Sequence, residues 1–266
     1  KPFAPRFFMA KAQERLGSMS ALRQLLRAAA RLPPKRAVRL NWGRAPEDLF
    51  QHLRSDGWMP QPLPWCAEAF AVQGDASGHH EAHLSGQLYF QEPTSMLPPL
   101  ALQEYMDIQK SGQHIQVLDL CAAPGSKASQ LGIWLRNRPG GGLLVANEPS
   151  PQRGEKLRTN LLRSGLMNTL VTIMDGRDMG ALVPGCFDAI LLDAPCSCEG
   201  NIRKEPVALL RGAASSRGPK NPLVLKQKEL LKSAWSALRP GGCLIYSTCT
   251  FDEFQNEIQC KKFLEA

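Results

Sequence analysis

Long hydrophobic runs are missing from this sequence, since no apolar stretch approaches the roughly 18 residues that span a membrane. The first residues also lack the compact apolar stretch of a secretory signal. We therefore expect a cytoplasmic protein with no membrane partner, whose eight cysteines are reduced thiols rather than a disulfide framework. Hydrophobic residues still make up 43% of the 266 positions, which is enough for a core in one or two domains.

The common nucleotide-binding motifs are absent as well. The segment VLDLCAAPGSKASQL (117–131) contains a single glycine, Gly125, and so matches neither G-x-G-x-x-G nor the P-loop. It does combine a hydrophobic strand that ends at Asp119, a turn of small residues and a helix expected from Ser126. Small residues let the backbone approach a ligand, and a helix N-terminus offers unpaired N–H groups. This turn favours a cofactor with a carboxylate and an amine, such as S-adenosylmethionine.

Positive charge is concentrated near the N-terminus. Residues 1–54 contain twelve Lys or Arg against three acidic residues, a net charge of +9, whereas the whole chain carries +8. A basic segment on a near-neutral body is typical of proteins that bind a polyanion, and we interpret it as a nucleic-acid-binding feature. A solvated helix face or an Arg-rich transit peptide is the alternative interpretation.

The sequence predicts a small N-terminal region over 1–90 and a larger domain over 91–266. In the first we expect a basic helix over 11–30, a strand over 37–42, a short helix over 46–54 and an irregular connector over 56–90. In the second, helices are expected over 94–110, 126–137, 151–164 and 222–238, and strands over 115–120, 143–148, 169–174, 187–193 and 243–248. Such alternation indicates an α/β domain with a parallel sheet covered by helices on both faces.

Acidic residues follow successive strands of this domain. Asp119, Glu148, Asp175 and Asp193 each stand at the end of a hydrophobic run. The carboxyl ends of parallel strands meet at one edge of the sheet, and an acid after the second strand can hold ribose hydroxyls. Four such acids predict a cofactor site at that edge, although solvated strand ends would give the same pattern.

Two cysteines also follow strand-like runs: Cys196 in AILLDAPCSCEG and Cys249 in CLIYSTCTFDEF. Because α/β enzymes place their chemistry past the carboxyl ends of strands, we interpret this pair as a nucleophile and a helper thiol rather than two small buried hydrophobic residues. Thr250 to Glu253 fits the S/T-x-x-E capping box, so we expect a helix directly after Cys249. The positive end of that helix would favour a thiolate, which makes Cys249 the better nucleophile.

These motifs carry a family resemblance. In order along the chain, DLCAAPGSK, ANEPSPQR, DGRD, DAPCSCEG and YSTCT resemble the Sun-family RNA (cytosine-5) methyltransferases. HLSGQLYFQEPTSMLP (83–98) and AVRLN look most like the bacterial small-subunit ribosomal RNA branch of that family. The resemblance covers nearly the whole chain. It implies a Rossmann-like α/β fold that uses S-adenosylmethionine, preceded by a smaller basic α+β region that binds RNA, here ribosomal RNA.

The resemblance also implies roles for individual residues. Cys249 would be the nucleophile that adds to carbon 6 of cytosine, and Cys196 would assist product release. Apart from the resemblance, the position of Asp193 after its strand suits it to accept a hydrogen bond from the cytosine amino group. S-adenosylmethionine would be bound by Cys121, Ala122, Ala123, Pro124, Gly125, Ser126, Lys127, Glu148, Asp175 and Asp193. RNA contacts are expected from Arg36, Arg39, Lys127, Arg203 and Lys204.

Cys198 is the least expected residue of the motif region, because the family usually has a glycine there. Together with Cys196 it suggests zinc, but no second pair of cysteines stands at finger-like spacing, so we expect no metal site. The chain stops at Ala266, early in the helix expected after Cys249, which points to a fragment or to a sheet completed in another way.

Two other functions compete with RNA methyl transfer. One is a non-catalytic RNA-binding or ribosome-assembly factor with a vestigial cofactor pocket, which the intact thiols of both motifs disfavour. The other is a DNA cytosine methyltransferase. That class places its nucleophile in the DAPC motif, which would leave the second cysteine motif unexplained.

Overall fold

The computed structural model describes residues 36–74, 76–201 and 218–265, together with four isolated residues nearer the N-terminus. The described residues fall into two compact units. One, here the sheet unit, comprises Lys35–Asp193 and Lys232–Tyr246. The other, here the cysteine unit, comprises the described residues within Lys1–Pro34, Ala194–Leu231 and Ser247–Ala266. The helix expected over 11–30 lies outside the described residues.

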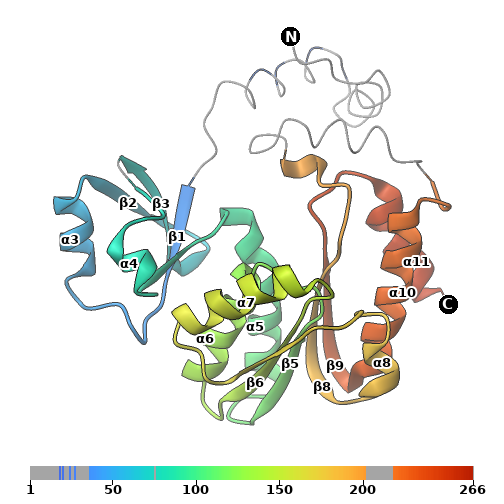
Figure 1. Cartoon of the computed structure of the whole chain (residues 1–266). Coiled ribbons are helices and arrows are strands. Elements are labelled where there is room, and N and C mark those ends of the chain that lie inside the picture. The colour runs from blue at the N-terminus through green and yellow to red at the C-terminus, as the bar shows by residue number, and fades with distance from the viewer. Residues whose placement is uncertain are drawn as a thin grey trace. The chain divides into compact units, whose positions relative to one another are not determined.

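The larger sheet of the sheet unit has the strand order β7-β6-β5-β8-β9, and β5 to β8 are parallel (Figure 1). Its strands are β5 (Ile115–Asp119), β6 (Gly142–Asn147), β7 (Thr169–Thr172), β8 (Phe187–Asp193) and β9 (Leu238–Ser247). The accompanying helices are α5 (Leu97–Gln109), α6 (Ser126–Asn137), α7 (Pro151–Arg163) and α8 (Met179–Leu182). Helix α10 (Pro222–Ala237) belongs to the cysteine unit up to Leu231 and to the sheet unit from Lys232. The expected α/β fold class is confirmed.

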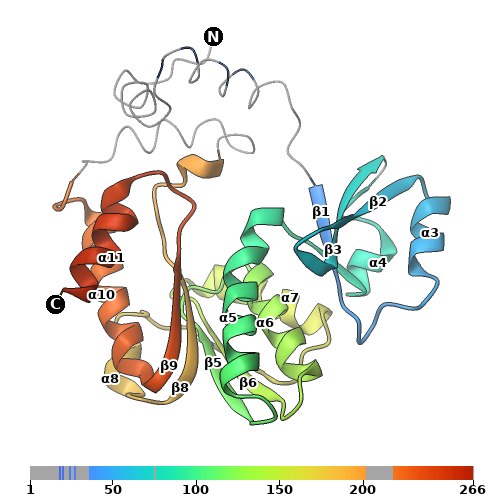
Figure 2. The ribbon, with the colours of Figure 1, turned by 180° about the vertical axis from the view of Figure 1, so that it is seen from behind.

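The core of this sheet consists of strands that are apolar on both sides. In β8 the run from Ala189 to Leu192 is fully buried, as expected for a parallel strand covered on both faces. Helix α6 packs on β6, α7 on β7 and α5 on β8, and the reverse view shows α5 beside α6 (Figure 2). Within the described part of the chain, no helix is long and apolar enough to cross a membrane.

The segment 56–90 forms three of the four strands of a second sheet, so the irregular connector expected there is wrong. Its strand order is β2-β3-β1-β4, with β1 (Arg36–Leu40), β2 (Trp58–Leu63), β3 (Cys66–Gly74) and β4 (Leu88–Phe90). The short helices α3 (Leu49–Ser55) and α4 (Glu81–Leu84) accompany it, and a 3-10 turn η1 (Pro93–Met96) leads into α5. Pro60 and Pro62 obscured the pattern, but β2 is an edge strand, where a missing N–H is tolerated.

Arg39 of β1 links the smaller sheet to helix α6. Its side chain is buried, with Nε donating to Gln91 Oε1 at 3.0 Å and Nη2 donating to Ser129 Oγ of α6 at 2.8 Å. Burial lowers the pKa of Arg39 to about 10, so the guanidinium keeps its charge at neutral pH. The RNA contact expected from Arg39 is therefore wrong, because the side chain is not at the surface.

The cysteine unit contains two 3-10 turns, η2 (Glu199–Asn201) and η3 (Glu253–Gln255), and the helix α11 (Glu257–Leu264). The helix expected directly after Cys249 is wrong, since α11 begins only at Glu257. The buried Thr250 hydroxyl donates to Glu199 and accepts the N–H of Asp252 at 3.1 Å, so it does not cap a helix. Without a helix N-terminus directly after Cys249, a helix dipole cannot be the reason for a thiolate at this position.

Candidate active site

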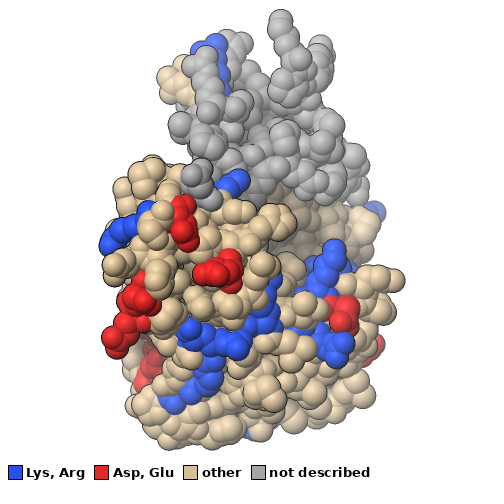
Figure 3. All heavy atoms as spheres, turned by 60° about the vertical axis from the view of Figure 1, so that its left-hand side comes forward, with Lys and Arg blue, Asp and Glu red and all other residues tan. Residues whose placement is uncertain are grey.

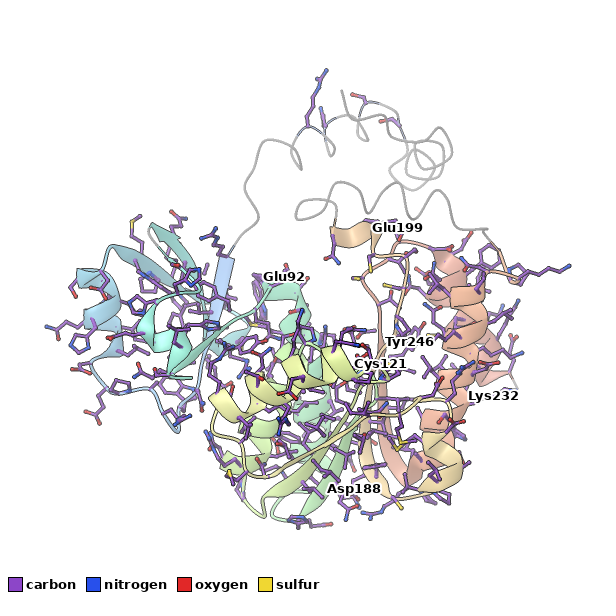
Figure 4. The ribbon with its side chains drawn as sticks, viewed as in Figure 1. Glu92, Cys121, Asp188, Glu199, Lys232 and Tyr246 are labelled. Carbon is purple, nitrogen blue, oxygen red and sulfur yellow. The ribbon has the colours of Figure 1, made fainter. Side chains whose placement is uncertain are left out.

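The acids that follow the strands do meet at one edge of the larger sheet. Asp119 and Asp193 are the last residues of the neighbouring strands β5 and β8, Glu148 follows β6, and Asp175 lies just beyond β7. Figure 4 labels Cys121 at this edge and Asp188 at the opposite end of the sheet. The sequence prediction of a shared edge thus agrees with the strand order.

The turn between β5 and α6 is fixed by side chains of α7. Arg153 Nη2 donates to the carbonyl of Ala123 at 2.9 Å, and Asn160 Nδ2 donates to that of Pro124 at 2.7 Å. Gly125 has a φ of 110°, and a Cβ there would lie 3.1 Å from Leu157 Cδ1. Glycine is therefore required at this position. Sequence reasoning missed both α7 side chains, although Arg153 belongs to the ANEPSPQR motif.

Glu148 and Asp175 are already oriented by donors. Glu148 is buried, and its carboxylate accepts the N–H of Ser150 at 3.0 Å and pairs with Arg153 at 3.2 Å. Asp175 is partly exposed and forms a bidentate salt bridge with Arg177, in which the shortest N–O distance is 2.7 Å. Both carboxylates are thus held in fixed directions at the sheet edge.

Asp119 differs from the other acids because its carboxylate is fully buried, and only the nearby Lys127 charge and the Cys121 N–H act to lower its pKa. Neither oxygen makes a hydrogen bond of ordinary geometry within the described residues. Burial, and then the nearby Asp193 carboxylate, raise the pKa of Asp119 from 3.8 to about 7. Asp193 itself pairs with Lys127 at 2.8 Å. An unsatisfied buried carboxyl group beside a turn of small residues fits a ligand that carries an amine.

Asn147 ties three of these strand ends together and was missed by sequence reasoning. It is the last residue of β6 and is fully buried. Its Nδ2 donates to the carbonyls of Leu120 at 3.2 Å and Met174 at 3.1 Å, and its Oδ1 accepts the Thr172 hydroxyl at 2.8 Å. The positions of the loops after β5, β6 and β7 therefore depend on one amide side chain.

Replacing Asn147 by alanine is expected to lower the free energy of unfolding by about 3 kcal/mol, because the Leu120 and Met174 carbonyls lose their buried donor and Thr172 its acceptor. Chemical denaturation measures the change. The matched control is Asn137→Ala at the exposed end of α6, where a change within about 0.5 kcal/mol is expected. Equal losses in the two variants would contradict the structural role of Asn147.

Within the cysteine unit, the fold brings the two predicted cysteines together. Cys196 Sγ lies 3.3 Å from Cys249 Sγ and 3.9 Å from Cys198 Sγ. Asn201 Nδ2 donates to Cys249 Sγ at 3.4 Å, and the N–H of Cys249 donates to Cys196 Sγ at 3.3 Å. Cys249 is exposed, while Cys196 and Cys198 are half-buried.

A buried acid braces the two cysteine loops against each other. Glu199 accepts hydrogen bonds from the hydroxyls of Ser197, at 2.7 Å, and Thr250. The Gly200 N–H donates to the carbonyl of Cys249 at 2.9 Å, and a Cβ on Gly200 would stand equally close to that oxygen. Glycine at 200 therefore permits the close approach of the loops. Sequence reasoning passed over Glu199, because one acid inside a loop carries no periodic signal.

The two thiols of the pair are not equivalent electrostatically. The hydrogen bonds with the Cys198 and Cys249 sulfurs, followed by burial, raise the pKa of the Cys196 thiol. Cys196 therefore keeps its proton at neutral pH and can donate it in a hydrogen bond to Cys249 Sγ. Asn201 is a second donor, and hydrogen bonds from these two groups would favour negative charge on the Cys249 sulfur.

Replacing Asn201 by alanine is expected to move the pH midpoint of Cys249 alkylation upward by about one pH unit, since one donor to the thiolate is lost. Asn201→Asp, which puts a carboxylate in place of the amide, should move the midpoint further. Mass spectrometry of the Cys249 peptide after iodoacetamide treatment at several pH values measures both shifts. An unchanged midpoint in both variants would rule out this role for Asn201.

The residues expected to contact RNA have separate outcomes. Arg36 is exposed, although Nη1 donates to the Ala76 carbonyl at 2.7 Å, and Lys127 is largely occupied by Asp193. Arg203 and Lys204 lie outside the described residues.

Sequence reasoning missed Arg44 and Arg136, whose charges are close enough to affect each other. Lys and Arg side chains gather in bands on the face shown in Figure 3.

Comparisons with known proteins agree with this arrangement. Residues 106–266 match the family "16S rRNA methyltransferase RsmB/F", and residues 4–93 match the "N-terminal domain of 16S rRNA methyltransferase RsmF". Ribosomal RNA small subunit methyltransferase F of Salmonella arizonae is 40% identical over 264 residues, which are 97% of this chain and 53% of the relative. The chain thus spans about half the length of the curated relatives it matches.

Two crystal structures are also similar. PH0851 is 26% identical with a TM-score of 0.85, over 98% of this chain and 56% of that chain. A methyltransferase homolog protein from Pyrococcus horikoshii is 29% identical with a TM-score of 0.70, over 99% of this chain and 83% of that chain.

The sheet order, the acids at its edge and these structural matches define a Rossmann-like methyltransferase fold. The chain belongs to the 16S rRNA methyltransferase RsmB/F family. The family resemblance is thereby confirmed, as is the expected cofactor, because this is a family of S-adenosylmethionine-dependent enzymes.

Proposed function

We propose that this protein transfers a methyl group from S-adenosylmethionine to carbon 5 of a cytosine in small-subunit ribosomal RNA. The observation that carries the proposal is the 3.3 Å approach of Cys196 and Cys249, two thiols that stand 53 residues apart in the sequence. Family membership supports RNA methyl transfer in general, and the thiol pair supports the choice of carbon 5. A cytoplasmic location would suit such a substrate.

The cofactor site is proposed at the carboxyl edge of the larger sheet. Bound there, S-adenosylmethionine supplies an electrophilic methyl group. Asp119 has a buried, unsatisfied carboxyl group that suits the amino group of this ligand, and the oriented Glu148 suits its ribose hydroxyls. The remaining proposed contacts are Cys121, Ala122, Ala123, Pro124, Gly125, Ser126, Lys127, Asp175 and Asp193.

The proposed chemistry begins with the Cys249 thiolate. Carbon 5 of cytosine is a poor nucleophile until the Cys249 sulfur bonds to carbon 6, which shifts the electron pair of the double bond to carbon 5. Asp193 would accept a hydrogen bond from the cytosine amino group and hold the base during this step. Carbon 5 would then take the methyl group, with S-adenosylhomocysteine as the leaving group, and would still carry its original proton.

Cys196 is proposed to act in the release step. Formation of the carbon–sulfur bond removes the negative charge on Cys249 that disfavours ionisation of Cys196. Cys196 can then release its own proton to solvent and, as a thiolate, accept the proton from carbon 5. The electron pair left behind restores the double bond and expels the Cys249 sulfur as a thiolate, so atoms and charge balance.

RNA binding is proposed for the N-terminal region, residues 1–90, which precedes the methyltransferase domain at 91–266. The net charge of +9 over residues 1–54 supports it. Arg44 extends the basic surface, since its Nη1 donates to the carbonyl of Arg163 at 2.8 Å and its charge reaches Arg136. Arg36, Arg203 and Lys204 complete the proposed contacts.

Incubation with radiolabelled S-adenosylmethionine and ribosomal RNA from the small subunit tests this function. Nucleoside mass spectrometry of the digested RNA is expected to show 5-methylcytidine and no other methylated nucleoside above background. RNA binding without any methylated product would favour the assembly-factor alternative. Methylated DNA in place of RNA would favour the DNA enzyme.

A further inference from the structure

Three thiols, rather than two, meet in the cysteine unit. The sulfur atoms of Cys196, Cys198 and Cys249 all lie within 4.8 Å of one another. Only two thiols are needed for the chemistry proposed above, so the third has no assigned purpose. Ligand sulfurs around a tetrahedral Zn²⁺ stand about 3.8 Å apart, because each Zn–S bond is about 2.3 Å long. The observed spacing therefore falls within the range of a metal-binding cluster.

The backbone of Cys198 has a conformation that residues other than glycine rarely adopt. Its φ is 63°, and it is the one non-glycine residue with a positive φ in the described part of the chain. Such a backbone conformation costs about 1 kcal/mol for a residue with a Cβ and suits glycine or asparagine better. The Cys198 Sγ contacts the Cys196 carbonyl at 3.3 Å, which turns its sulfur toward the pair. A thiol is thus kept where the backbone favours glycine.

The surroundings supply what a metal–thiolate centre needs beyond its ligands. The N–H of Cys249 points at Cys196 Sγ, and Asn201 Nδ2 points at Cys249 Sγ. Hydrogen bonds of this kind stabilise the charge of thiolate ligands and fix their direction. Cys249 is exposed, so an ion can enter from solvent. Glu199 Oε2 accepts hydrogen bonds from both the Ser197 and Thr250 hydroxyls, and Glu199 is not among the residues whose possible ligand atoms gather here.

We propose that Cys196, Cys198 and Cys249 form a binding site for Zn²⁺ or a similar thiophilic divalent cation, with water as the fourth ligand. This revises the sequence expectation of no metal site, which rested on finger-like spacing along the chain. On binding, the three thiols release their protons to solvent and each sulfur donates an electron pair to the ion. The oxidation states of metal and sulfur do not change.

The consequence for catalysis rests on the function proposed above. A Cys249 sulfur that is bound to a metal ion cannot add to carbon 6 of cytosine, because its electron pair is already shared. Metal binding would therefore switch the enzyme off reversibly. Cys198, which takes no part in the methyl-transfer steps, would be the residue that makes the pair sensitive to metal.

Titration of the reduced, metal-free protein with Co²⁺ in the absence of oxygen tests the site directly. The wild-type chain is expected to bind about one Co²⁺ with a thiolate-to-cobalt charge-transfer band and the visible bands of a tetrahedral ion, both lost on adding Zn²⁺. Cys198→Gly is expected to bind Co²⁺ and Zn²⁺ more than about 100-fold more weakly, since even the loss of an outer-shell partner can cost that much.

Two further variants keep the test decisive. Cys198→Asn tolerates the same backbone conformation but lacks a sulfur, so it should behave like Cys198→Gly. Cys260→Ser removes a thiol of α11 that lies outside the cluster and should bind cobalt like wild type. The proposal is overturned if wild type shows no charge-transfer band, or if removing Cys198 leaves cobalt affinity unchanged.

The spectra separate this proposal from the methyl-transfer function. If the protein methylates RNA, Zn²⁺ should inhibit wild type and leave Cys198→Gly much less affected. If the protein has no methyl-transfer activity, the cobalt titration still decides whether the site exists. A Cys196–Cys198 disulfide that forms in air, without a cobalt spectrum under reduction, would count against the metal site.

Discussion

Cys249→Ala is expected to lower the rate of RNA methylation by about 10⁴-fold or more, because the carbon 6 adduct can no longer form and removal of an enzymatic nucleophile has effects of this size. Single-turnover methylation with labelled S-adenosylmethionine measures the loss. Cofactor affinity should not change, since the proposed cofactor residues lie in the sheet unit and Cys249 does not.

The matched control is Cys260→Ala, a thiol in the same unit that lies outside the cysteine cluster. It should methylate RNA at the wild-type rate. A Cys249→Ala variant that retains activity within about tenfold of this control would show that another residue attacks the base.

Asp119→Asn is expected to become more stable relative to wild type by about 4 kcal/mol as pH rises from 4 to 8. The pKa of Asp119 is raised from 3.8 to about 7, first by burial and then by the Asp193 carboxylate. Between these values the folded protein keeps a proton that the unfolded chain has lost, so wild-type stability falls as pH rises through this window. Each pKa unit corresponds to about 1.4 kcal/mol.

Chemical denaturation of both proteins at several pH values gives the difference in their free energies of unfolding. The effect of the new amide itself does not depend on pH, so it cancels when this difference is compared between pH 4 and pH 8. Asn137→Ala, which removes no titratable group, is the control and should show a constant difference. The Asp119 variant should also bind S-adenosylmethionine more weakly, because the amine of the ligand loses its charged partner. A stability difference that does not change with pH would contradict the raised pKa of Asp119.

The larger sheet could be predicted from the sequence because its signals are local. Each strand is a continuous apolar run, as in β8, and most ends at or just before an acid. Parallel order then places those acids at one edge without any knowledge of contacts. For the same reason Cys196 and Cys249 could be named as partners, since each follows a strand of the same sheet.

The rest depended on contacts that the sequence does not display. Asn147 and Glu199 act through partners far along the chain, and Arg39 looks like a surface cation until its bonds to Gln91 and Ser129 are known. The capping-box pattern after Cys249 failed because Glu199 takes the Thr250 hydroxyl. Prolines in an edge strand hid the smaller sheet.

The central claim is that Cys249 attacks the base and Cys196 serves its release. RNA containing 5-fluorocytidine tests this directly, because fluorine at carbon 5 cannot leave as a proton and the adduct becomes permanent. Peptide mapping of the trapped complex is expected to place the RNA on Cys249, with no complex from Cys249→Ala and an undiminished yield from Cys196→Ser. A cross-link to Cys196, or trapping by Cys249→Ala, would contradict the assignment.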